Sequence, residues 1–140
     1  MAKGFGRLSN GAFLDAIFKT VNPLYVSLHA GDPGDDGQSG SEPSGGSYAR
    51  VSTAPANWNA ATVATPSVSD NAAAITFLAA TADWVGGSNL THAGLWDHAT
   101  STLEANYIGR IELSTAKPIL NTEQAVFAIG AFVMQMNQTT

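Results

Sequence analysis

The chain has 140 residues, of which 44% are apolar and 12% charged, and it contains no cysteine. This length suits one domain with a single core, and the lack of cysteine excludes disulfides and thiolate metal sites. The net charge of −5 and the scattered lysines and arginines exclude a basic surface for nucleic acid. So little charge is compatible with a compact β protein whose surface is rich in Ser, Thr, Asn and Ala, or with an exterior covered by partner subunits.

Residues 1–22 are expected to form an N-terminal arm and a short helix. Apolar residues between Leu8 and Val21 recur at three- and four-residue steps, which makes one stripe on a helix. Ser9 or Asn10 is expected to cap its start, and Asn22-Pro23 to end it. The stripe, which could dock on its own sheet or on a neighbour, consists of Phe13, Leu14, Ile17, Phe18 and Val21.

Residues 23–140 are expected to form a single β domain. Apolar and polar residues alternate from Leu24, which predicts a half-buried strand, and His98–Glu104 is the expected turn of a hairpin. Ala125–Met136 is apolar on both faces, which predicts a central covered strand with a bulge or a close backbone contact at Gly130, and its apolar run is too short to span a membrane. The expected strands are Leu24–Ala30, Tyr48–Ala54, Thr62–Ser69, Ala73–Ala79, Leu90–Asp97, Ala105–Leu113 and Ala125–Met136. Six to eight such strands predict an all-β fold, a β-sandwich or jelly-roll-like barrel with a short N-terminal α-helix.

A long solvated loop is expected at residues 31–47. It holds six glycines, two prolines and four carboxylates but no large apolar side chain. Such a loop is either disordered or ordered as an arm on a neighbouring subunit. Asp32–Gly37 lacks the closing Glu of an EF-hand, so solvated turn residues are expected there rather than a calcium site.

The search for a catalytic or metal site finds no complete motif. His92 and His98 have no third ligand at metal-binding spacing, and Gly37–Ser41 does not match a nucleophile elbow. We therefore expect a non-enzymatic protein without metal or cofactor. Arg50 and Asp83 lie beside aromatics and form either an ion pair or two independent surface charges. The remaining aromatics could stack on sugars or serve as core or interface anchors, namely Trp58, Trp84, Trp96, Tyr48 and Tyr107.

Four short motifs occur in a characteristic order: Leu24-Tyr25-Val26, Tyr48-Ala49-Arg50, Ala82-Asp83-Trp84 and His92-Ala93-Gly94-Leu95-Trp96-Asp97. In their order and spacing the chain resembles, from Leu8 to Met136, a family of small structural proteins of tailed bacteriophages often labelled tail-fibre proteins. It departs from the usual pattern in the longer loop at 31–47 and at Leu120-Asn121-Thr122, where a glycine-containing turn is more typical.

The resemblance implies a virion component assembled in the host cytoplasm. A capsid decoration (cement) subunit on the capsid surface, trimeric and bound to the major capsid protein, is the first hypothesis, since no repeat or heptad of an extended fibre is visible. The first alternative is a tail or tail-fibre subunit that contacts the host surface, and the second alternative is a carbohydrate-binding module. The expected contact residues are Lys3, Phe5, Arg7, Phe13, Ile17, Asp32, Asp35, Asp36, Trp58 and Trp84.

Overall fold

The structure, a computed structural model, describes residues 6–136, so the expected contact residues Lys3 and Phe5 lie outside the described part. The described chain forms one α-helix and eight strands, which confirms the predicted all-β fold with an N-terminal helix. The elements are α1 (Arg7–Phe18), β1 (Leu24–His29), β2 (Val51–Thr53), β3 (Ser67–Asp70), β4 (Ile75–Thr76), β5 (Leu90–Trp96), β6 (Tyr107–Lys117), β7 (Val126–Phe127) and β8 (Val133–Met136), with short 3-10 turns at Pro55–Asn57, Trp84–Gly87 and Glu104–Asn106.

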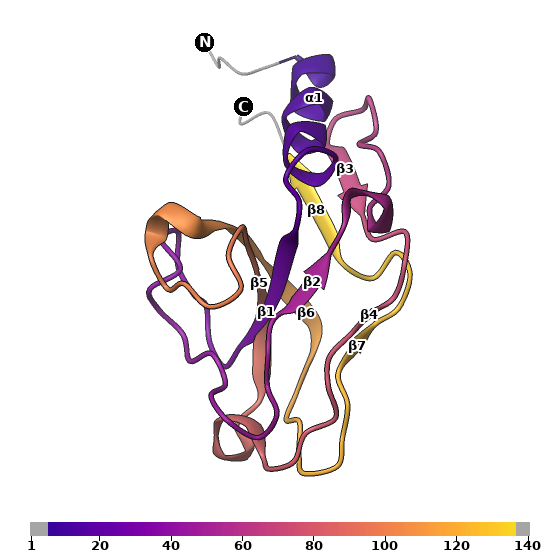
Figure 1. Cartoon of the computed structure of the whole chain (residues 1–140). Coiled ribbons are helices and arrows are strands. Elements are labelled where there is room, and N and C mark those ends of the chain that lie inside the picture. Colours follow the sequence, from indigo (N-terminus) through magenta and orange to yellow (C-terminus); the bar gives the residue numbers. More distant parts are fainter. Residues whose placement is uncertain (1–5, 137–140) are drawn as a thin grey trace.

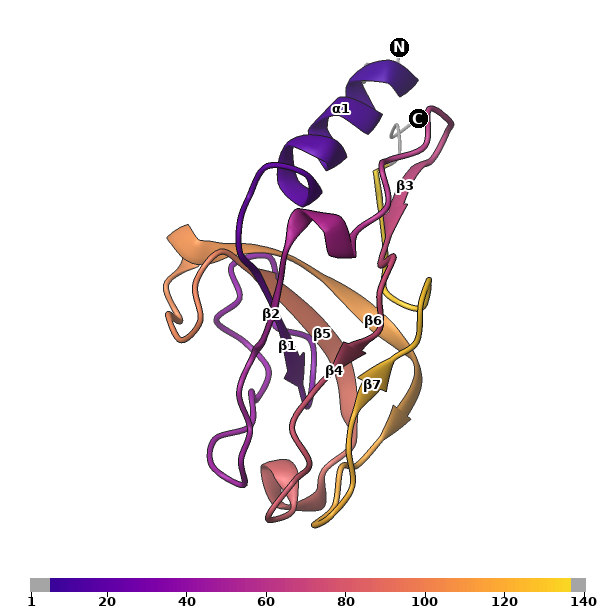
Figure 2. The same cartoon turned by 45° about the vertical axis from the view of Figure 1, so that its right-hand side comes forward.

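The strands form one large sheet and two small ones. The large sheet has the order β2-β1-β5-β6, and β5 and β6 are the two strands of the predicted hairpin. The small sheets are β3-β8 and β4-β7 (Figures 1 and 2). Within residues 6–136 no strand pairing joins β6 to β8 or β2 to β4, so the sheets do not close into a barrel.

Strand β1 is covered on both faces, which differs from the half-buried strand predicted. Its core face carries Leu24, Val26 and Leu28, each at most 2% exposed. The opposite face of the sheet, which we call the loop face, carries Ser27 and His29, which are 0% and 2% exposed. The loop face is buried because the 31–47 loop folds back across the sheet instead of extending into solvent, and an alternating pattern cannot reveal such a cover.

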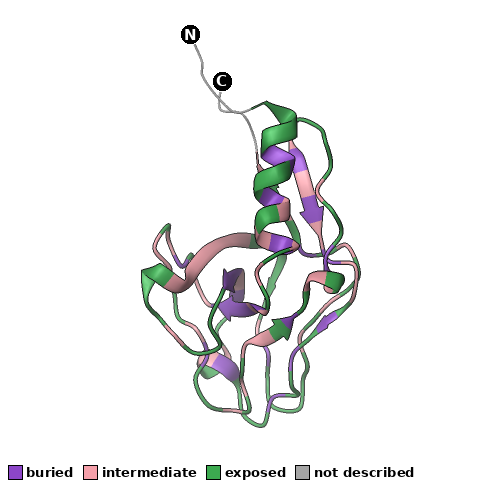
Figure 3. Cartoon of the chain, turned by 45° about the horizontal axis from the view of Figure 1, so that its top comes forward, coloured by how far each residue is buried: buried purple, intermediate pink, exposed green. Residues whose placement is uncertain are grey.

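Helix α1 docks on its own chain, against β3 and β8 (Figures 1 and 3). Its inner side carries Leu14 and Phe18, while its outer side is exposed. Gly11 lies on the inner side, where a Cβ atom would come within 3.3 Å of the Thr62 carbonyl oxygen. The prediction that Ser9 or Asn10 caps the helix is wrong, because the helix already begins at Arg7. Its N-cap is Gly6, which has no side chain.

The segment 125–136 is not the central covered strand that was predicted. It divides into β7, which pairs with β4, and β8, which pairs with β3. Between them the chain turns at Gly130, whose φ of +76° lies in the left-handed region that glycine favours. Val126 and Val133 are 52% and 40% exposed. Apolar residues on both sides of this segment therefore reflect two short strands with an exposed apolar edge, and only Phe132 enters the core at 0% exposure.

Candidate interaction surfaces

An arginine on the loop face holds the base of the 31–47 loop. The guanidinium of Arg50 donates to both carboxylate oxygens of Glu42, at 2.8 and 2.7 Å, and lies 3.8 Å from the centre of the Trp96 ring. It also donates to the carbonyls of His98 and Ser101. Only 3% of the Arg50 side chain is exposed. The predicted pair of Arg50 with Asp83 is therefore wrong, and so is the alternative of an independent surface charge.

Glu42 also accepts a hydrogen bond from the hydroxyl of Tyr48, at 2.8 Å. That hydroxyl in turn accepts from the backbone N–H of Leu28, at 3.0 Å. Burial, and secondly the negative charge of Glu42, raise the pKa of Tyr48 well above its ordinary value, so the phenol stays protonated and donates. This group of satisfied polar contacts ties the loop to β1.

A second arginine holds the tip of the loop. Arg110 on β6 contacts Asp32 at 2.5 Å and Asp35 at 2.7 Å, and it donates to the Gly34 carbonyl. The hydrogen bond from the Gly34 N–H, together with Arg110, lowers the pKa of Asp32. Gly37 passes so close to the sheet that a Cβ atom there would lie 2.7 Å from the ring of Tyr107. The loop thus has fixed anchors and is not the freely solvated segment predicted.

Asp32 and Asp35 share Arg110, whereas Asp36 accepts the backbone N–H of Gln38 at 3.0 Å. The described residues contain no group of three metal-ligating side chains. His98 instead accepts backbone N–H groups of Thr100 and Ser101 through its Nδ1 atom. The acidic loop therefore uses its carboxylates for internal contacts.

His29 lies buried beneath the loop. Its Nε2 atom is 2.7 Å from the hydroxyl of Ser27, which also accepts the indole N–H of Trp96 at 2.8 Å. Its Nδ1 atom has no hydrogen-bond partner within the described residues. Burial lowers the pKa of His29 to about 4, while the nearby charges of Glu42 and Arg50 act in opposite directions. The imidazole is thus held neutral in the folded chain.

The tryptophans expected at an interface or sugar site are buried. Trp58, Trp84 and Trp96 are each 1% exposed. Trp58 packs between Phe18 and Phe132, and its indole N–H donates to Thr53 at 2.9 Å. Trp84 donates to the Gly46 carbonyl. Burial removes these rings from the surface, so they neither stack on a sugar nor present a contact to a partner.

The expected contact residues of α1 lie at or near its outer side. Arg7 is exposed at its start, Phe13 is 43% exposed and Ile17 is half-buried. Leu8 on the same helix is 72% exposed. In Figure 1 this helix lies apart from the loop at 31–47, so the structure does not bring the two predicted groups together.

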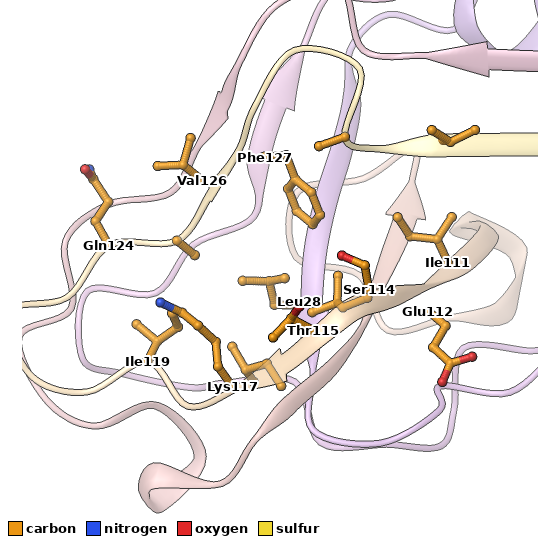
Figure 4. Close-up of a pocket in the computed structure, with 15 residues that line it drawn as sticks. Leu28, Ile111, Glu112, Ser114, Thr115, Lys117, Ile119, Gln124, Val126 and Phe127 are labelled. Carbon is orange, nitrogen blue, oxygen red and sulfur yellow. The ribbon is translucent and has the colours of Figure 1, made fainter.

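An open cleft of about 440 Å³ separates β6 from the segment 124–133 (Figure 4). Its floor includes Leu28 and Ile119, each 2% exposed. The ring of Phe127 points across the cleft toward Leu28, whereas Glu112 points away from it. Lys117 and Gln124 lie toward one end of the cleft and Ile111 toward the other, so the cleft is elongated.

Sequence reasoning missed the residues that make this cleft and the two loop anchors. Arg110 and Glu42 were visible only as charges without partners. Lys117 ends β6, and Val126 and Val133 were assigned to a covered strand. The one usable signal was Gly130, since a glycine within an apolar segment also marks a turn.

Comparison with known proteins assigns the chain to a protein family. No helix among residues 6–136 is long and apolar enough to cross a membrane. A search of curated proteins finds no match. The model of one protein family, described as Podophage GP4 fiber I protein gp80, matches residues 7–135. Because this match covers most of the chain, the protein belongs to that family of phage fibre proteins, which confirms the resemblance to phage structural proteins.

Proposed function

We propose that the chain is a non-enzymatic subunit of a phage tail fibre, and that it works by packing against other virion proteins. The observation that carries this proposal is the family match over residues 7–135, because the family is described as a podophage fibre protein. The description favours the tail-fibre alternative over the capsid-decoration hypothesis.

The surface supports a packing role. Large apolar side chains are exposed at many places on the surface, and charged residues make up only 12% of the chain. Apolar, charge-poor surface is typical of the buried centre of an interface. The exposed large apolar residues are Leu8, Phe13, Val63, Leu78, Leu103, Leu120, Val126, Ile129 and Val133.

Two of the expected contact regions remain part of the proposal. The outer side of α1, with Arg7, Phe13 and Ile17, is proposed as one contact with a neighbour, and Lys3 and Phe5 precede it in the chain. The acidic loop with Asp32, Asp35 and Asp36 is proposed as the second. Its anchors on Arg50 and Arg110 present it in one conformation, which lowers the entropy cost of binding.

Copy number and position on the virion test the proposal. Quantitative mass spectrometry of purified particles should give few copies, and antibody labelling in electron micrographs should locate them at the tail. Hundreds of copies on the head would overturn the proposal in favour of a decoration protein, which is expected to be trimeric and to bind the major capsid protein. Release of sugars or peptides from host envelopes by the purified chain would overturn its non-enzymatic part.

A further inference from the structure

The cleft between β6 and 124–133 is an open space within the described part of the chain. Its floor is apolar, and its rim carries Val126 and Val133, two of the exposed large apolar residues. A volume of about 440 Å³ is within the size range of ligand sites. The cleft therefore has room for a few apolar side chains of a partner.

The peptide backbone of β6 indicates what kind of partner fits. β6 is the edge strand of the large sheet, so none of the described strands pairs with its outer side. Its register with β5 shifts between Glu112 and Lys117, so that the four residues 113–116 stand opposite the single residue Thr91. Polar peptide groups thus line the cleft beside apolar side chains. An acyl chain would bury these groups without hydrogen bonds, whereas an extended peptide can pair with them.

One cation lies at an end of this cleft. The ammonium group of Lys117 forms neither an ion pair nor a hydrogen bond with any of residues 6–136, whereas Arg50 and Arg110 are bound to carboxylates. Lys19 donates to backbone carbonyls. A free ammonium group beside an apolar cleft is complementary to a ligand that has a carboxylate next to its apolar part.

We propose that this cleft binds an extended peptide segment of another virion protein, with apolar side chains at alternate positions and a carboxylate beside Lys117. Alternate side chains of such a segment point to one side, which matches a cleft bordered by an edge strand. The segment adds to the β6 side of the large sheet and covers Leu113 and Val133. The inference rests on the proposed function only in taking the segment from a virion protein.

The test uses two synthetic hexapeptides with blocked ends, Val-Thr-Val-Thr-Val-Glu and Val-Thr-Val-Thr-Val-Lys, titrated into the ¹⁵N-labelled full chain. The glutamate peptide should shift the amide signals of residues 113–117 and 124–127 and bind about fivefold more tightly than the lysine peptide. Lys117→Glu should reverse this preference. Arg7→Glu is the matched control, because Arg7 on α1 likewise forms no ion pair with any of residues 6–136, and it should leave the preference unchanged.

Three outcomes overturn the inference. The first is the absence of saturable shifts with either peptide, and the second is an unchanged preference in Lys117→Glu. The third is another occupant of the cleft, revealed by dodecanoate shifting the same signals without peptide binding, or by concentration-dependent dimerisation that shifts them. Virion position is measured separately on particles, so a failed peptide titration and a failed tail location are distinguishable.

Discussion

The two faces of the four-stranded sheet are covered in different ways. On the loop face, the 31–47 loop is fixed by charged and polar contacts, chiefly Arg50 with Glu42 and Arg110 with Asp32 and Asp35. On the core face, two small sheets pack through apolar side chains but leave a cleft beside β6. The chain thus covers one face by itself and leaves the other open at one edge, where we infer that a partner contributes.

The largest effect is expected on the core face, from Phe132→Ala. Phe132 is fully buried and packs against Trp58 and Phe127, with ring centres 5.3 and 5.4 Å apart. The cavity left behind should lower the free energy of unfolding by about 3–5 kcal/mol, measured by urea unfolding. Val133→Ala, at the adjacent exposed position, is the control and should cost less than about 1 kcal/mol. Equal costs would mean that the cleft wall is packed like the core.

On the loop face, Arg50→Ala should cost about 3 kcal/mol, because Glu42 and two backbone carbonyls lose a largely buried partner. Arg50→Lys should recover only part of this, since an ammonium cannot pair with both carboxylate oxygens and stack on Trp96 in the same way. Urea unfolding measures the loss, and amide signals of residues 31–47 report whether the loop is released. A loss below about 1 kcal/mol would show that the loop does not depend on this contact.

Acid should weaken the loop face through His29. The folded chain holds His29 neutral with a pKa of about 4, whereas the unfolded chain binds a proton near 6.5. The unfolded state therefore gains protons first as the pH falls, and stability should drop between pH 6.5 and 4 by at most about 3 kcal/mol.

Urea unfolding between pH 7 and 4, compared with His29→Gln, isolates this effect. The variant should show a flatter dependence in that range whatever its stability at pH 7. Parallel curves for both proteins would contradict the assignment to His29.

The smallest effect is expected at the tip of the loop. Arg110 is 30% exposed and its partner Asp35 is 98% exposed, so solvent screens their attraction. Arg110→Ala should cost less than about 1 kcal/mol, and less still at 1 M salt, where charges are screened over a few ångströms. A cost close to that of Arg50→Ala would remove the distinction between the base and the tip of the loop.

Local patterns predicted the elements that depend on local sequence. The apolar stripe of α1 and the hairpin expected at Leu90–Asp97 and Ala105–Leu113 correspond to real elements, because the helix packs its apolar face on its own chain and the two strands pair with each other. The prediction of one covered strand at 125–136 was wrong. Apolar residues on both faces suit a covered strand, but they also suit two short strands joined by a turn at Gly130. Periodicity alone does not separate these structures.

The candidate surfaces were harder to predict because their parts come from distant segments. Glu42 and Arg50 are close in sequence, yet the burial of Arg50 depends on Trp96 and on the carbonyls of His98 and Ser101. The cleft lies between β6 and residues 124–133. It is open because β7 and β8 pair with β4 and β3 and not with β6. Such contacts depend on the whole topology.

The anchoring of the 31–47 loop also indicates where this protein can accept new sequence. Arg50 and Arg110 hold the loop through Glu42 and through residues 32–35, while a Cβ atom at Gly45 would meet no other atom within 4 Å. An inserted tag or foreign epitope at Ser44–Gly45 would extend into open space and leave both anchors in place. The same tolerance would let related phages diversify this loop while the sheet beneath it stays unchanged.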